Sequence, residues 1–100
     1  MYVVNLCHIS PWAATTGLFA AAARLLESGG HLCIYGPFKV EGAFTSDGNR
    51  DFDQSLQSRD AAWGIRDVSE LQEAGKPLGI TLENTHEMPA NNLLLHFRKA

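Results

Sequence analysis

Two mostly apolar runs of strand length flank an amphipathic helical stretch in the first third of the chain. The runs cover residues 3–9 (VVNLCHI) and 31–35 (HLCIY). Between them, from Pro11 to about Glu27, apolar side chains recur at the three-and-four spacing of one buried helical stripe. These are Leu18, Phe19, Ala22, Leu25 and Leu26. Strand, helix and strand in this order predict a parallel βαβ unit with a right-handed crossover.

Capping residues predict where this first helix begins and ends. Ser10 is a good N-cap, and Pro11 suits the first helical position because its missing N–H costs nothing there. Gly29 and Gly30 predict the end of the helix, since glycine readily takes the left-handed conformation that closes a last turn.

Residues 39–66 form the least regular part of the chain. They are polar, and the spacing of Phe52 and Leu56 predicts one short helix over residues 49–59. The segment follows the second strand, so it is an insertion at the carboxyl edge of the sheet. Long loops at that edge are more often substrate lids than spacers.

The last third predicts a helix and an antiparallel pair of strands. Asp67 and Glu70 form a capping box, and Gly75 ends the short helix that follows. Residues 79–88 alternate between apolar and polar, residues 89–92 (PANN) have turn chemistry, and residues 93–98 form a last strand. A connection this short makes the last strand antiparallel to its predecessor. The order is therefore β-α-β-insert-α-β-β.

Composition and charge limit which binding partners and which cellular location we expect. A formal net charge of -3 offers no basic surface for nucleic acid and makes an anionic membrane an unfavourable partner. No run approaches the roughly 20 apolar residues of a membrane span, so we expect a cytoplasmic protein. Cys7 and Cys33 form no CxxC pair, and the aspartates have no metal-ligand spacing, so no metal site is expected.

A terminal antiparallel hairpin on a parallel sheet resembles the carboxyl-terminal half of the Rossmann-like class I methyltransferase fold. The resemblance implies an α/β fold in which the last strand lies between the two preceding strands. Six motifs in order also resemble the methyltransferase-like protein 26 family, and the similarity runs from Val4 to Lys99. The motifs are Asn5-Leu6-Cys7-His8-Ile9-Ser10, Gly17-Leu18-Phe19, Tyr35-Gly36-Pro37-Phe38, Asn49 with Phe52-Asp53, Trp63-Gly64-Ile65-Arg66-Asp67 and Met88-Pro89-Ala90-Asn91-Asn92.

The resemblance implies S-adenosylmethionine as cofactor. In that fold a glycine-rich loop after the first strand holds the cofactor, and no G-x-G occurs in these 100 residues. We therefore expect residues 1–100 to be a partial, substrate-side domain that is inactive alone.

Candidate site residues gather where the parallel strands end, because ligands of such sheets bind beyond the carboxyl ends. His8 is the candidate general base, although a histidine packed at a strand end is as good a reading. Asn5, Leu6 and His8 are the candidate cofactor contacts. The candidate substrate contacts are Ser10, Tyr35, Pro37, Phe38, Asn49, Trp63, Arg66, Asn91 and Asn92. Each also has a structural interpretation as a core, turn or loop anchor.

Two functions remain open. One is the substrate half of a methyltransferase that acts on a small molecule or a protein side chain. The other is a non-catalytic protein that associates through the exposed edge of the strand from Val3 to Ile9.

Overall fold

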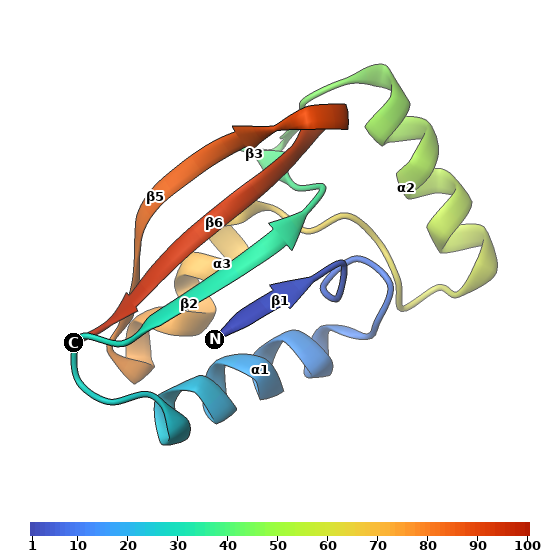
Figure 1. Ribbon diagram of the computed structural model, residues 1–100. Coiled ribbons are helices and arrows are strands. Elements are labelled where there is room, and N and C mark those ends of the chain that lie inside the picture. Colours follow the sequence, from blue (N-terminus) through green and yellow to red (C-terminus); the bar gives the residue numbers. More distant parts are fainter.

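A four-stranded mixed sheet forms the centre of the fold in the computed structural model, which describes all 100 residues (Figure 1). Its strands are β1 (Tyr2–Val4), β2 (His31–Gly36), β5 (Ile80–Met88) and β6 (Asn92–Lys99), in the order β1-β2-β6-β5. β1 and β2 are parallel, and β6 is antiparallel to both of its neighbours. The predicted α/β fold with an antiparallel last strand is confirmed.

Helices α1 (Trp12–Leu25) and α3 (Val68–Gly75) pack against one face of this sheet. Phe19 of α1 and Leu71 of α3 are fully buried against Leu32 and Ile34 of β2. The ring of Phe19 meets that of Phe97 edge to face, with centroids 5.2 Å apart, a preferred geometry for aromatic pairs. Burial of this single face holds the domain together.

The opposite face of the sheet carries no helix. Tyr2 and Val4 of β1 lie on it, with 62% and 51% of their surfaces exposed. Further along the same face, His31 Nδ1 and His96 Nε2 lie 2.7 Å apart. This face is therefore partly apolar and open to solvent.

The predicted first strand is wrong beyond Val4. Asn5 takes a left-handed φ of 54°, and residues 5–10 form a turn rather than a strand. The Ser10 hydroxyl donates to the carbonyl of Leu6 at 2.7 Å, so it closes this turn and does not cap α1, whose N-cap is Pro11. An edge running from Val3 to Ile9 is likewise absent, because the strand has only three residues.

Helix α1 also ends earlier than the apolar stripe predicts. It stops at Leu25, whose side chain is 65% exposed, and Gly29 takes its positive φ only in the following turn. The Lys99 ammonium donates to the carbonyls of Ala23 and Leu26. A cation at a helix C-terminus stabilises carbonyls that have no partner within the helix, so Lys99 supplies the cap that glycine was expected to give.

The insertion contains a hairpin that the sequence did not predict, β3 (Lys39–Val40) with β4 (Ala43–Phe44). The expected helix is α2 (Asp47–Arg59), two residues longer at its start because Ser46 is its N-cap. The capping box of α3 is confirmed. Two 3-10 turns, η1 (Lys76–Leu78) and η2 (Pro89–Asn91), lead into the last two strands. No helix of the chain combines the length and apolar character needed to cross a membrane.

Candidate functional site

The carboxyl ends of β1 and β2 bring together two residues that the sequence predicts for the site. A Cβ atom built on Gly36, the last residue of β2, would lie 3.5 Å from His8 Nδ1 and 3.7 Å from Asn5 Oδ1. The His8 ring and the Asn5 carboxamide oxygen therefore both lie next to Gly36, where a larger side chain would press on them. The left-handed φ of Asn5 turns the chain so that His8 returns over β2.

His8 lies in an apolar setting. Its residue surface is 5% exposed, and its ring centroid lies 5.7 Å from that of Phe52 in α2. Burial disfavours the charged imidazolium and lowers the pKa of His8 below its ordinary value of 6.5. At neutral pH the ring is neutral and able to accept a proton.

The segment after α2 is bound to the turn that carries His8. Gly64 N–H donates to the carbonyl of His8 at 3.1 Å. The carboxylate of Asp53, which is buried, accepts from Ile65 N–H at 2.7 Å and from Gln57 Nε2 at 2.8 Å. Figure 1 shows α2 beyond the carboxyl ends of β1 and β2. The insertion therefore lies over this edge of the sheet, as expected.

A second group of predicted residues meets at the same edge. Asn49 Nδ2 donates to the carbonyl of Asn91 at 3.2 Å and to Thr45 Oγ1 at 3.1 Å. Asn92 Nδ2 donates to the Tyr35 hydroxyl at 3.1 Å. A hollow of about 210 Å³ lies here. It is lined by Thr45, Glu87, Met88, Asn91, Asn92 and Leu93.

The other predicted substrate contacts have structural partners. Pro37 is buried, and Phe38, 1% exposed, belongs to the hydrophobic core. Trp63 is half-buried in the segment after α2, and its N–H donates to the carbonyl of Asp60. The guanidinium of Arg66 donates to backbone carbonyls. The half-buried Leu6 contributes its carbonyl to the turn closed by Ser10.

The sequence missed two parts of the site. Phe52 was expected to pair with Leu56 on a buried helix face, yet it is 37% exposed and contacts His8. Asp53 was assigned no role, and the only sequence signal for it is that it lies three residues before Leu56, on the same face of α2. No three or more His, Cys, Asp or Glu side chains are arranged to hold a metal ion.

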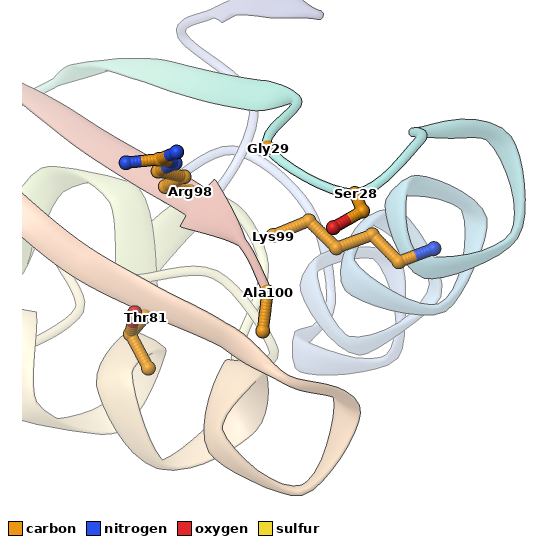
Figure 2. Close-up of a pocket in the computed structure, with 6 residues that line it drawn as sticks. All are labelled: Ser28, Gly29, Thr81, Arg98, Lys99 and Ala100. Carbon is orange, nitrogen blue, oxygen red and sulfur yellow. The ribbon is translucent and has the colours of Figure 1, made fainter.

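A larger hollow, about 370 Å³, lies at the amino end of β2 (Figure 2). Its two cationic side chains are engaged, since Lys99 caps α1 and Arg98 lies 3.5 Å from Glu83. It lies at the opposite end of β2 from His8, so we do not assign it to the site.

Residues 1–99 match the protein family described as "Protein of unknown function (DUF938)". The chain belongs to the DUF938 family. Among solved structures, it is similar to TnmH, with a TM-score of 0.78 and 16% identity over 99% of this chain and 30% of that one. It is also similar to CalO1, a methyltransferase in calicheamicin biosynthesis in its SAH-bound form, with a TM-score of 0.80 and 12% identity over 99% and 29% of the two chains.

A third similar structure is NcsB1, an O-methyltransferase from neocarzinostatin biosynthesis in complex with S-adenosylmethionine and 2-hydroxy-5-methyl naphthoic acid. Its TM-score is 0.76 and its identity 12%, over 99% of this chain and 28% of that one. The DUF938 chain thus has the fold of the carboxyl-terminal part of a Rossmann-like methyltransferase. It spans about 30% of the length of these solved structures.

Proposed function

We propose that this chain forms the acceptor side of an S-adenosylmethionine-dependent methyltransferase, and that its family is the methyltransferase-like protein 26 family. The observation that carries the proposal is the meeting of His8 and Asn5 over the bare backbone of Gly36 at the carboxyl edge. The methyltransferase fold of the similar structures, two of them in complex with S-adenosylmethionine or its product, supports it.

In this proposal His8 is the general base. Methyl transfer to a hydroxyl or amine requires the acceptor to lose a proton, and an imidazole kept neutral by burial accepts one near pH 7. Phe52 and the segment after α2 exclude water from one side of that ring. The remaining requirement is alignment of the acceptor, which positioning residues supply.

The placement of two further residues at this edge supports cofactor contacts there. The Asn5 side chain is exposed and faces the position above Gly36, and Leu6 is half-buried beside it. In the proposal Asn5, Leu6 and His8 contact S-adenosylmethionine, which supplies an electrophilic methyl group when bound. The acceptor lies toward the polar group of Asn49, Asn91, Asn92 and Tyr35. A small molecule and a protein side chain are both open as the acceptor.

Calorimetric titration with S-adenosylmethionine and S-adenosylhomocysteine tests this function. The titrations use the chain alone and a longer protein in which this sequence completes a methyltransferase sheet. We expect binding to the longer protein, and a Gly36→Val variant to lose it because the new side chain fills the position between His8 and Asn5. Gly17→Ala is the control, since a Cβ there meets nothing within 4 Å. Absence of binding to both proteins would contradict the proposal.

A second candidate function is association with another chain through β1. Tyr2 and Val4, exposed on the face without a helix, favour it, and β1 is an edge strand whose outer side is unpaired. Light scattering at increasing concentration, with Val4→Lys as the variant, tests it. A mass that stays that of a monomer for the unmodified chain would reject this function.

A further inference from the structure

Arg66 has an unusual set of partners for an arginine beside a candidate site. Its Nε donates to the carbonyl of Cys7 at 3.2 Å, and its Nη2 donates to the carbonyls of Ser10 at 3.1 Å and Ala62 at 2.8 Å. Its guanidinium carbon also lies 5.6 Å from the ring centroid of Trp12. No carboxylate forms a salt bridge with it. The side chain thus binds backbone and an aromatic face only.

Two of these three carbonyls, those of Cys7 and Ser10, identify what Arg66 holds. Cys7 and Ser10 lie on either side of His8, so the guanidinium is bonded to the turn both before and after the residue that presents the imidazole. The planar fork of arginine fixes two acceptors at once, whereas a lysine ammonium acts as a single, freely rotating point charge. Two hydrogen bonds from one guanidinium restrict the rotation of the turn far more than a single bond would.

The main chain of Arg66 joins this turn to the neighbouring strand end. Lys39 N–H donates to the carbonyl of Arg66 at 2.9 Å, just after the loop that leaves β2. Two residues earlier, Gly64 N–H binds the carbonyl of His8, and the next N–H, that of Ile65, binds the buried Asp53 of α2. One short segment therefore connects the His8 turn, the exit of β2 and helix α2.

We propose that Arg66 is the positioning residue of this site: it locks the turn that carries His8 and couples the orientation of the imidazole to the docking of α2. Calling His8 the base rests on the proposed function, but the locking of the turn does not. In the absence of the fork, the turn rotates and the His8 ring leaves Phe52. The imidazole is then no longer aligned with the acceptor.

Nuclear magnetic resonance of the full 100-residue chain tests the locking without cofactor or acceptor. Three proteins are compared: the unmodified chain, Arg66→Met, and the control Arg98→Met, which removes an arginine at the other end of the sheet. For Arg66→Met we expect loss of the nuclear Overhauser effects between His8 and Phe52. The pKa of His8 should also rise toward its ordinary value as water reaches the ring. Arg98→Met should leave both signals unchanged.

A folded Arg66→Met chain with unchanged His8 signals would overturn the proposal, because a merely structural arginine lowers stability without moving the ring. If that variant does not fold, Arg66→Lys decides, since it keeps the charge and lacks the fork. His8 signals like those of the unmodified chain in Arg66→Lys would overturn the proposal equally.

In the longer protein, the same substitution should lower kcat by about 10²-fold while KM for S-adenosylmethionine changes little, because misplacing a catalytic group affects the chemical step. Failure of the longer protein to bind S-adenosylmethionine would overturn the proposed function and leave the resonance result for Arg66 standing. The two failures are therefore distinguishable.

Discussion

Substitution of Asp67 by alanine tests how the insertion is attached to the fold. The Asp67 side chain is the N-cap of α3: its Oδ1 accepts from Ser69 N–H at 2.9 Å and from the Ser69 hydroxyl at 2.8 Å. Its Oδ2 accepts from Gly42 N–H in the β3–β4 hairpin at 2.6 Å. One carboxylate, 7% exposed, therefore joins the helix start to the hairpin.

The expected loss follows from these bonds. Removing an aspartate N-cap costs about 1 kcal/mol. Loss of the charge-assisted bond to Gly42 costs about 1 kcal/mol more, at the low end for such bonds because Gly42 is solvent-exposed and water replaces the carboxylate. A loss of about 2 kcal/mol lowers the Tm of a 100-residue domain by about 8 to 16 °C.

The pH dependence provides an independent test of the same carboxylate. Burial raises the pKa of Asp67, but hydrogen bonds from Ser69 and Gly42 and the charge of Lys39 outweigh it, so the pKa lies below its ordinary value. The native state therefore favours the ionised form. The stabilisation is fully present above the unfolded pKa of about 3.9 and is lost as pH falls through the lower native pKa. The stability difference between the unmodified chain and Asp67→Asn should shrink over that range.

Thermal and urea unfolding followed by circular dichroism measure both effects. The control is Asp60→Ala, which removes one exposed hydrogen bond to Ala62 N–H and should change the Tm little. A Tm for Asp67→Ala equal to that of Asp60→Ala would refute the reasoning. A stability difference between the unmodified chain and Asp67→Asn that stays constant down to pH 2 would refute the contribution of the Asp67 charge.

Three further predictions concern the site and the core. Burial lowers the pKa of His8, so the native state favours the neutral ring. The stability that this neutral ring contributes is present above about pH 6.5 and is lost as pH falls through the lower native pKa. The acid-induced decrease in Tm should therefore be smaller in His8→Gln than in the control His86→Gln. Phe19→Ala should lower the free energy of unfolding in urea by about 3–5 kcal/mol, because removing the fully buried ring leaves a cavity. A loss no larger than that of a surface substitution would contradict this prediction. Lys99→Met should increase amide hydrogen exchange in the last turn of α1, whereas Lys76→Met should not.

Two features that depend on local sequence were predicted correctly. The parallel βαβ unit follows from two apolar runs and one helical stripe, and the capping box at Asp67 and Glu70 lies where its motif places it. The position of β6 between β2 and β5 came from a resemblance of topology, since the sequence of a strand does not say which neighbours it pairs with.

Two features were not predicted, one set by a local turn and one by a distant partner. The run from Val3 to Ile9 looks like one strand because a short apolar run has no period that separates a strand from a buried turn. Only the left-handed Asn5 and the bond from Ser10 to Leu6 break it. The end of α1 depends on Lys99, which is more than 70 residues away in the chain, so no local pattern at Gly29 and Gly30 reveals it.

The same distinction explains how the candidate site was predicted. Asn5 and His8 were proposed for the site because parallel strands end at one edge, and topology alone brings those ends together. Gly36, which lies next to both side chains, was not among the predicted site residues. Their support comes from α2 and the segment after it, where Arg66 binds backbone carbonyls and Asp53 binds the backbone of Ile65 as well as the Gln57 side chain. A bond to a backbone group does not depend on the residue type of the partner, so the sequence gives no sign of it. A substrate role for Arg66 was therefore a natural prediction from its charge, although its hydrogen bonds are made to the turn that carries His8.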